Sequence, residues 1–250
     1  MTSSKKEFNK LIMEAMGVFA LCYVGGWAVQ WAIHSQLDLA GVALAHAVVL
    51  GLFIFIGFEV SGSHFNPAVT IALCITGYQS KDEAVRYIIA QGIGSLLAGF
   101  VLLACQPLSL SNDNALGHQL GHPSLDPQYS QINGFFCEFI ATSFLVLSVF
   151  SAGVHKKASA ETVSASVGLS LGLSVLAIGN YTGAALNPCR VLGPALFSGT
   201  IVERGFWIYY LGPIIGGAFT GIAYKYIFIE TDEEREEVVN VSLKEELAKI

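Results

Sequence analysis

Six long apolar runs alternate with short polar segments along the chain. They lie near residues 11–33, 41–60, 84–105, 132–153, 162–180 and 206–228. Each run has roughly the 20 residues that a helix needs to cross about 30 Å of hydrocarbon. The pattern therefore predicts an all-α membrane protein with six transmembrane helices.

Two further apolar runs, near residues 66–77 and 187–198, are too short to cross a bilayer. As helices they would be only about 18 Å long, at roughly 1.5 Å per residue. Hydrocarbon does not tolerate lipid-exposed irregular backbone. We therefore expect both runs to be re-entrant half-helices that are buried inside the bundle.

An Asn-Pro pair opens each short run, as Asn66-Pro67-Ala68 and Asn187-Pro188-Cys189. Asparagine caps free backbone N–H groups at a helix N-terminus, and proline at the first helical position gives up a donor that has no partner there. Small residues lead into each pair, over residues 61–65 and 182–186. Two broken helices in matched halves of a membrane protein indicate segments that meet near the bilayer midplane.

The two motifs belong to an internal repeat. Asn66 and Asn187 are 121 residues apart, and Glu14 and Glu138 are 124 apart. Four further pairs share an offset of 122: Tyr87 with Tyr209, Gln91 with Pro213, Gly94 with Gly216 and Gly99 with Gly221. Each repeat, near residues 11–105 and 132–228, holds three spans and one half-helix. Because three is an odd number of crossings, the second copy is inverted relative to the first.

The composition agrees with a membrane location. Hydrophobic residues make up 53% of the 250, and charged residues only 13%, against about 25% in soluble domains. Mean hydropathy is +0.58. Most of the net charge of −6 belongs to the residues from Glu230 onward, which carry eight acids and three bases. We expect residues 1–10 and the acidic tail at 229–250 to be solvated segments.

Lysine and arginine are distributed unequally between the two sides of the membrane. Lys5, Lys6 and Lys10 precede the first span, and the segments after the second, fourth and sixth spans also contain Lys or Arg, whereas the loops at 34–40 and 106–131 carry neither residue. The positive-inside rule therefore predicts that both termini are cytoplasmic. The bias leaves open whether the membrane is vacuolar, another intracellular membrane or the plasma membrane.

Four residues from separate elements are predicted to reach one depth. Arg190 follows Asn187 by one turn, about 5 Å outward of the midplane, and His46 lies roughly 7 Å outward in the second span. Val175 in the fifth span and Ala184 before the second motif fall at a similar level. A charged residue at membrane depth costs roughly 2.5–3.5 kcal/mol, so Arg190 is a functional candidate. Together the four would form a narrow, donor-rich constriction that repels cations and passes small neutral molecules.

Both histidines of this region have a second interpretation. The alternative for His46 is a core histidine that bonds a neighbouring carbonyl, and the matching depth of Arg190 favours the constriction instead. The role of His64, in the approach to the first motif, stays open between a functional residue and one that only holds its loop in shape.

The paired motifs also suggest how protons are excluded. The side chains of Asn66 and Asn187 would offer donors to the channel centre, where the two half-helix N-termini, each worth about half a positive charge, also point. A water molecule at this point would donate outward in both directions, so a hydrogen-bonded proton relay would be broken.

Glu14 and Glu138 are acidic residues within apolar spans, at equivalent positions in the two repeats. Their symmetric placement favours a structural role over ion coupling or catalysis. Because buried charges need partners, we expect both carboxylates to accept backbone N–H bonds from the re-entrant loops.

Nothing in the sequence indicates catalysis or a metal centre. The five cysteines have no metal-type spacing and are interpreted as small buried hydrophobic residues: Cys22, Cys74, Cys105, Cys137 and Cys189. The chain has no recognisable nucleophile–base pair and no phosphate-binding loop. We expect no catalytic residues, no metal, no cofactor and no nucleic-acid partner.

Over about residues 10–228 the chain resembles the aquaporins, or major intrinsic proteins. The residues that carry the resemblance are Ser61 to Val69, Thr182 to Arg190, Glu138 with Thr142, and Gly212-Pro213. Two such loops in opposed repeats are highly specific, whereas one Asn-Pro-Ala would not be. The resemblance implies a homotetramer in a lipid bilayer, in which every protomer holds its own water pore.

The resemblance also implies roles for single residues. Backbone carbonyls would line the pore as acceptors at Gly62, Ser63, His64, Gly183, Ala184 and Ala185. The family's selectivity filter maps onto the four residues reached from depth: His46, Val175, Ala184 and Arg190. This filter resembles that of the vacuolar (tonoplast) branch, which implies ammonia, urea or hydrogen peroxide as further solutes. Val191 stands where glycerol-conducting members have Asp, which argues against glycerol, and Cys189 replaces the usual alanine and would offer a thiol beside the pore.

The competing hypothesis is a structural or complex-bound membrane subunit that keeps this fold with a closed pore. The acidic tail and the loop at 106–131 would then be its docking surfaces.

Overall fold

The computed structural model describes residues 3–106, 120–154, 159–201 and 205–229. Several predicted features lie outside these residues. They are the acidic tail after Ile229, half of the loop at 106–131, and the basic residues between the fourth and fifth spans.

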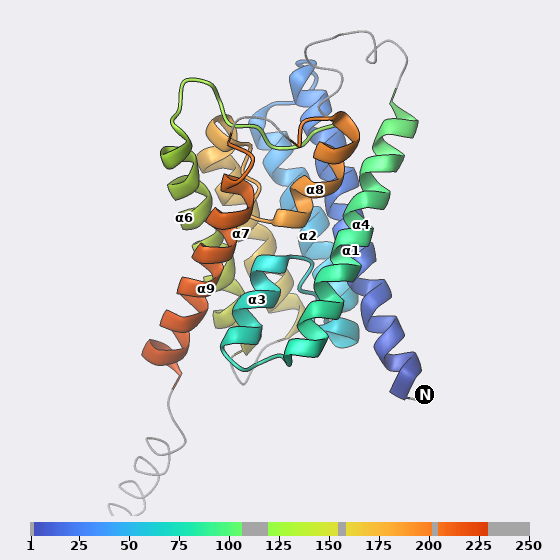
Figure 1. Ribbon diagram of the computed structural model, residues 1–250, viewed down its shortest axis with the longest axis vertical. Coiled ribbons are helices and arrows are strands. Elements are labelled where there is room, and N and C mark those ends of the chain that lie inside the picture. The colour runs from blue at the N-terminus through green and yellow to red at the C-terminus, as the bar shows by residue number, and fades with distance from the viewer. Residues whose placement is uncertain (1–2, 107–119, 155–158, 202–204, 230–250) are drawn as a thin grey trace, which may run out of the picture.

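Helices form all the regular secondary structure of these described residues, which confirms the all-α prediction. In chain order they are α1 (Ser3–Ile33), α2 (Leu39–Ser61), α3 (Pro67–Ile75), α4 (Lys81–Cys105), α6 (Gln131–Val149), the π-helix η2 (Phe150–Val154), α7 (Ala160–Thr182), α8 (Pro188–Ser198) and α9 (Ile208–Phe228). Ser3 and Phe228 lie at the same end of the bundle (Figure 1), which we call the terminal side; the opposite end is the far side.

The two short helices begin in the middle of the bundle and run in opposite directions. Helix α3 occupies the half toward the terminal side, and α8 occupies the half toward the far side (Figure 1). Pro67 and Pro188 are their first residues, and the side chains of Asn66 and Asn187 accept from the backbone of the first turn. The structure thus has both predicted half-helices, with the capping that the Asn-Pro pairs indicate.

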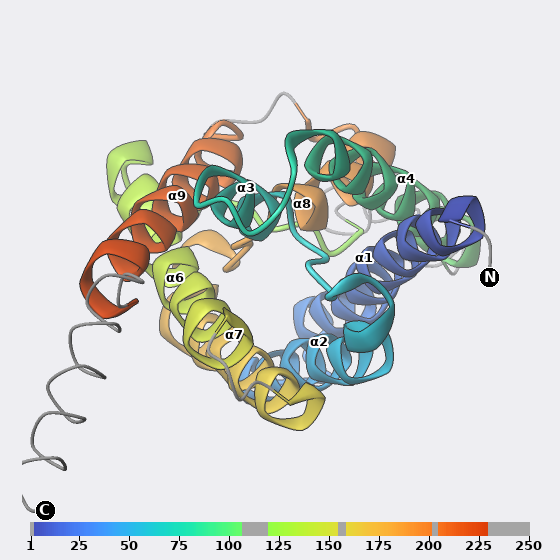
Figure 2. The same ribbon diagram turned by 90° about the horizontal axis from the view of Figure 1, so that it is seen from below.

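Each half-helix packs on a long helix of the other repeat. Within the repeats, α1 contacts α2 and α4, and α6 contacts α7 and α9, while α2 and α7 join the two halves. The long helices form a ring in the view from the terminal side (Figure 2). Helix α3 packs mainly on α9, and α8 mainly on α4. Neither repeat therefore completes its wall without the other.

Among the described residues, five helices are long and apolar enough to cross a membrane: α1, α2, α4, α6 with η2, and α7. Helix α9, which matches the sixth predicted span, has 21 residues and runs alongside the others (Figure 1). Its tyrosines, its glycines, Lys225 and Pro213 lower its hydropathy, and it is not among the five. The sixth span exists as a helix, but hydropathy alone is weak support for it.

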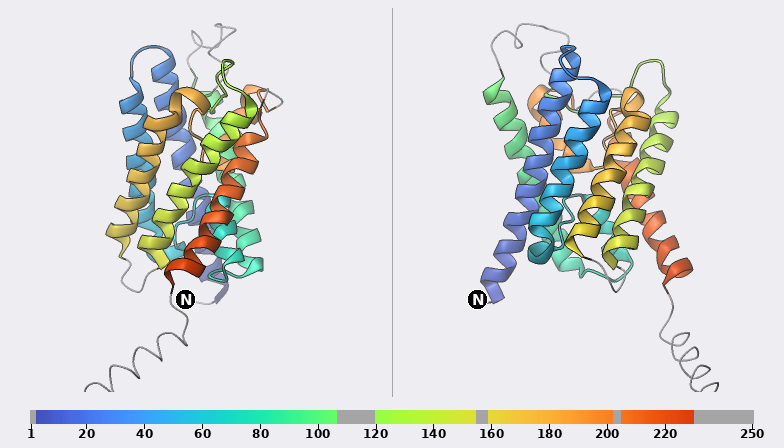
Figure 3. Two further views of the ribbon diagram at one scale, coloured as in Figure 1. Left: turned by 90° about the vertical axis from the view of Figure 1, so that its left-hand side faces the viewer. Right: turned by 180° about the vertical axis from the view of Figure 1, so that it is seen from behind.

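Helix α1 begins earlier than its apolar pattern predicts. Residues 1–10 are expected to be a polar segment, yet the helix starts at Ser3 and projects toward the terminal side (Figure 3). Lys10 Nζ lies 2.6 Å from Glu83 Oε1, and Arg86 Nη2 lies 3.1 Å from Glu7 Oε2. These ion pairs hold the charged turns of α1 against the first turns of α4.

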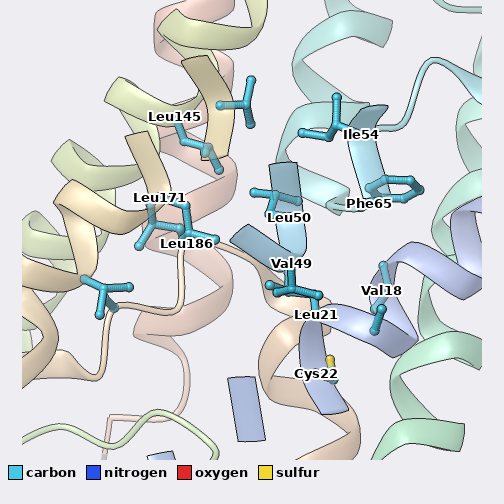
Figure 4. Packing of buried hydrophobic residues seen from close by; sticks show 14 of the residues in the cluster. Val18, Leu21, Cys22, Val49, Leu50, Ile54, Phe65, Leu145, Leu171 and Leu186 are labelled. Carbon is cyan, nitrogen blue, oxygen red and sulfur yellow. The ribbon is translucent and has the colours of Figure 1, made fainter. Parts of the chain in front are cut away.

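The core lies between the two repeats and at close helix crossings. Side chains from α1, α2, α6 and α7 gather there, together with Phe65 and Leu186 from the re-entrant loops (Figure 4). A Cβ on Gly94 would lie 2.1 Å from Ala15 O, and one on Gly216 would lie 2.3 Å from Phe139 O. Helices α1 and α4, and likewise α6 and α9, therefore touch through their backbones, the contact by which helices associate in lipid.

Candidate functional site

The two re-entrant loops share one unusual backbone. Gly62 and Gly183, which end α2 and α7, are left-handed with φ of 81° and 78°. Two non-glycine pairs are also left-handed, with φ between 50° and 54°: Ser63 with Ala184, and Phe65 with Leu186. Non-glycine residues seldom adopt this conformation, and surrounding structure must hold them in it.

Glu138 holds the second loop in this shape. Its Oε1 accepts from Thr182 Oγ1 at 2.7 Å and from Ala185 N at 3.0 Å, and its Oε2 accepts from Leu186 N at 2.8 Å. The side chain is fully buried. Since every partner is a donor, an ionised carboxylate fits this site.

Glu14 holds the first loop in the same way. Its oxygens accept from the Ser61 hydroxyl at 2.7 Å and from the backbone N–H groups of His64 at 3.0 Å and Phe65 at 2.8 Å. A fourth donor, Gln91 Nε2 at 2.8 Å, has no counterpart because the equivalent residue is Pro213. Each acid therefore stabilises its own loop, but Glu14 accepts from one more donor than Glu138 does.

Asn66 and Asn187 join the tips of the half-helices. Each Oδ1 accepts from the backbone N–H two residues later, at 2.9 Å. Each Nδ2 donates to a backbone carbonyl of the opposite loop: Asn66 to Leu186 O at 2.9 Å, and Asn187 to Phe65 O at 2.8 Å. An amide carries two N–H bonds, so one bond per asparagine remains for the cavity that both residues line.

His46 and Arg190 are in direct contact. Arg190 Nε and Nη2 lie 3.4 Å and 3.3 Å from His46 Nε2, and His46 Nδ1 lies 2.9 Å from Val42 O. A carbonyl only accepts and a guanidinium only donates. His46 is therefore a neutral imidazole with its proton on Nδ1. His46 thus bonds a neighbouring carbonyl and also contacts the cation, so the two interpretations do not exclude each other.

A cavity of about 340 Å³ extends from Tyr78 and Val154, near the terminal side, to His46 and Arg190. Apolar side chains of α2 and α7 form much of its wall, including Leu50, Ile54, Val163, Val167 and Leu171. Its polar groups come from the two loops with their asparagines, and from His46, Arg190 and Tyr78. This combination of an apolar wall and a polar strip is typical of a narrow path for small polar molecules.

The other predicted site residues divide into two groups. Gly62, Ser63, His64 and Ala185 line the cavity together with the two asparagines, whereas Gly183, Ala184 and Val175 are not among its lining residues. Val175 and Ala184 are buried at 2% and 3% exposure. Both belong to an apolar cluster of which other members, such as Leu50 and Leu171, line the cavity.

The remaining motif residues pack behind the cavity rather than along it. Pro67, Ala68, Pro188 and Cys189 are all buried in the first turns of α3 and α8. The Cys189 side chain joins the apolar cluster that includes Cys22 of α1 and is not among the lining residues. His64 does line the cavity, and its Nδ1 lies 3.1 Å from Thr70 Oγ1.

Residues 120–123 were not singled out from the sequence, yet one of them, Gly121, contacts the guanidinium of Arg190. Arg190 Nη2 donates to Gly121 O at 2.7 Å, and Leu120, Gly121, His122 and Pro123 are buried. A Cβ on Gly121 would lie 2.3 Å from Gly26 O. The glycine therefore lets this segment reach the pore mouth, and no periodicity marks such a return in the sequence.

His122 should leave the charge of this mouth unchanged near neutral pH. Burial lowers the pKa of His122 from 6.5 to about 4, and the Arg190 charge acts in the same direction. We expect constant water permeability between about pH 5 and pH 8. In the unfolded chain His122 takes up its proton near pH 6.5, so its contribution to the free energy of unfolding is full above that pH and is lost as the pH falls toward about 4.

Stopped-flow permeability and thermal unfolding against pH, for the wild type and His122→Ala, check this prediction. The variant should lose part of the fall in melting temperature between about pH 6.5 and pH 4. A permeability step near neutral pH that disappears in His122→Ala would contradict it.

Comparisons with known proteins agree with this geometry. A model of the family described as "Major intrinsic protein" matches residues 1–224. "Aquaporin TIP4-2" of Zea mays is 33% identical over 214 residues, which cover 85% of this chain and 79% of the relative. "Nodulin-26" of Glycine max is 31% identical over 88% of this chain and 78% of its own.

A solved structure gives the same fold. The X-ray structure of the aquaglyceroporin from Plasmodium falciparum matches with a TM-score of 0.80, at 24% identity, and covers 88% of this chain and 96% of that chain. The inverted arrangement of long helices and half-helices is thus shared with an experimental structure.

Proposed function

This chain belongs to the major intrinsic protein family, and from that premise we propose that its pore passes water and small neutral solutes while it excludes protons and ions. At the coarse level, membership makes the chain a multi-pass membrane channel for water and not an enzyme. The solutes, the exclusion of ions, the orientation and the assembly are the proposed part.

The contact between His46 and Arg190 at the end of the cavity is the observation that carries the proposal. Arg190 uses Nε and Nη2 in bonds within the protein, while Nη1 has no partner among the described residues. A fixed cation with a free donor attracts the oxygen of a neutral solute and repels other cations. We propose that Val175 and Ala184 form the apolar side of this constriction, and that ammonia, urea and hydrogen peroxide pass it besides water.

Proton exclusion is proposed to occur where Asn66 and Asn187 meet. Each amide is fixed by two bonds, so the remaining N–H bonds have one direction. The positive ends of the α3 and α8 dipoles add to the donors. A water molecule that accepts from both asparagines can only donate away from this point, which interrupts a proton relay in both directions.

Stopped-flow light scattering on proteoliposomes tests this function. Vesicles with the protein should shrink faster than bare lipid under an osmotic gradient, with low activation energy, and an internal pH dye should report no matching proton flux. Water permeability equal to that of bare lipid would favour the competing hypothesis of a closed-pore subunit. Proton flux in step with water flux would disprove the proposed role of the asparagines.

His46→Phe should narrow the constriction. The larger ring fills space beside Arg190 and cannot accept from its guanidinium. We expect urea permeability to fall more than water permeability, by about fivefold relative to water if one hydrogen-bonding position is lost. The ratio of the two permeabilities measures this, and an unchanged ratio would mean that His46 does not face the solute path.

The assembly and orientation follow from the family and the charge pattern. We propose a homotetramer with one pore per protomer, in which the terminal side faces the cytoplasm, as the distribution of Lys and Arg predicts. Cross-linking of the purified protein and protease protection of its tail in sealed vesicles test the two statements separately.

A further inference from the structure

The α8 half-helix, which carries Arg190, is held by a hydroxyl from outside the helix. Ser95 of α4 is fully buried; its Oγ donates to Cys189 O and accepts from Gly193 N at 2.8 Å. In a regular α-helix the N–H of residue 193 would bond the carbonyl of residue 189. The Ser95 hydroxyl thus contacts both groups of one helical bond, in the turn that contains Arg190.

The next carbonyl in this turn also lacks a helical donor. Residue 194 would donate to Arg190 O, but Pro194 has no N–H. The thiol of Cys22, on α1 (Figure 4), lies 3.8 Å from Arg190 O and 3.5 Å from Cys189 O. Two side chains from two long helices therefore serve the carbonyls on either side of the Arg190 Cα.

The backbone leaves little room for this turn to shift. A Cβ on Gly193 would lie 1.9 Å from Ser95 O, and one on Gly99 would lie 2.5 Å from Gly193 C. Helices α4 and α8 are in backbone contact at this crossing. A change at the Ser95 hydroxyl is therefore transmitted to α8 instead of being absorbed by a gap.

The other half-helix lacks all three features. By the repeat offsets, Gly217 corresponds to Ser95, Val146 to Cys22, and Leu73 to Pro194. The structure supports this match, because a Cβ on Gly217 would lie 3.0 Å from Ala68 O and 3.3 Å from Val146 Cγ2. The contact on α3 is apolar, and α3 carries no charged residue.

We propose that Ser95 and Cys22 are positioning residues that fix the first turn of α8 and thereby the guanidinium of Arg190. They do not line the cavity, so they set selectivity through the backbone that carries the cation. The inference rests on the proposed channel function and adds two specificity-determining residues to it.

The test uses the full chain in proteoliposomes, with water and urea as the probes. Ser95→Ala should raise the ratio of urea to water permeability by about fivefold, as expected for one lost buried hydrogen bond. Cys22→Ala should raise it less, because a thiol is a weak donor, and Cys22→Ser, which keeps a donor, should restore the wild-type ratio. The matched control is Ser143→Ala, which removes a hydroxyl bonded to Phe139 O and Gly216 O, away from α8.

The ratio separates positioning from folding. Loss of folded protein lowers both permeabilities together and leaves their ratio unchanged. If Ser95→Ala conducts with the wild-type ratio, the inference is wrong. If Ser95→Ala yields no folded channel, the Cys22 variants decide, and equal ratios for Cys22→Ala and the wild type overturn it.

Hydrogen exchange gives a readout that does not depend on flux. Ser95→Ala should speed amide exchange in residues 189–193, because this turn loses its bond to α4, while Ser143→Ala should not. Unchanged exchange in this turn would overturn the inference. Failure of the channel function itself is distinguishable, because it would appear as missing water flux in the unmutated protein.

Discussion

Replacing Arg190 by alanine is expected to open the constriction to larger solutes and to remove its barrier to cations. At an effective dielectric constant of about 20, a cation about 5 Å from the guanidinium feels a repulsion of roughly 3 kcal/mol, or about a hundredfold in entry. The lost side chain also vacates the space between His46 and Gly121, whose acceptors it bonds. Urea permeability relative to water, and a cation-dependent current across planar bilayers, measure the two effects.

Arg86→Ala is the matched control for Arg190→Ala. Arg86 is exposed on α4 and pairs with Glu7 at 3.1 Å, far along the chain from the constriction. Its removal should leave both selectivities as they are. The selectivities of Arg190→Lys should lie between those of Arg190→Ala and Arg86→Ala. An ammonium keeps the charge but cannot bond His46 and Gly121 in the same planar geometry. Intact cation exclusion in Arg190→Ala would refute the proposed role.

Glu138→Gln is expected to cause the largest loss of stability for the smallest change in shape. Each carboxylate oxygen faces donors, so the new amide NH₂ must point at Leu186 N or at the Thr182 and Ala185 donors. Leaving buried donors unpaired costs about 3 kcal/mol or more in the free energy of unfolding. For a chain of this size the melting temperature should fall by about 6–12 °C, as measured by thermal unfolding in detergent.

Glu14→Gln should cost less than Glu138→Gln, although the two acids are equivalent by symmetry. Gln91 donates to Glu14 through Nε2, and its Oε1 has no partner among the described residues. Rotation of the Gln91 amide would present an acceptor to the new NH₂ group. Near Glu138 the equivalent residue is Pro213, which has no side-chain amide that could rotate. Equal losses for the two variants would show that Gln91 does not adapt.

Glu83→Gln is the control for both acid variants. Glu83 is partly exposed and pairs with Lys10 at 2.6 Å. Such surface pairs contribute about 0–1 kcal/mol. The melting temperature should therefore change by less than about 4 °C.

The arrangement of helices could be predicted because its determinants are local or repeated. The Asn-Pro pairs mark where α3 and α8 begin, the offset between Asn66 and Asn187 reveals the repeat, and the three spans per repeat imply that the second copy is inverted. The contact of His46 with Arg190 could be anticipated because depth along a helix follows from residue count. These properties depend on position along one helix and not on the rotation or register of a neighbouring helix.

The features that could not be predicted depend on long-range contacts. The return of Gly121 to Arg190 follows a segment without periodicity, and the insertion of Ser95 into α8 depends on the register of two crossing helices. Hydropathy also missed the first turns of α1, because Glu7 and Lys10 are stabilised by charges more than 70 residues away. An apolar pattern carries no signal for such pairings.

The packing of α3 on α9 has a consequence for biosynthesis. The ribosome releases α3 long before Ile208–Phe228, the helix on which it rests, and at 5–20 residues per second the delay is roughly 7–27 s. Hydrocarbon does not tolerate the short helix α3, with its irregular approach loop, before α9 covers it. We therefore expect the nascent chain to keep this segment in the translocation machinery or at the membrane surface until the last helix has been inserted and can complete the wall of the cavity.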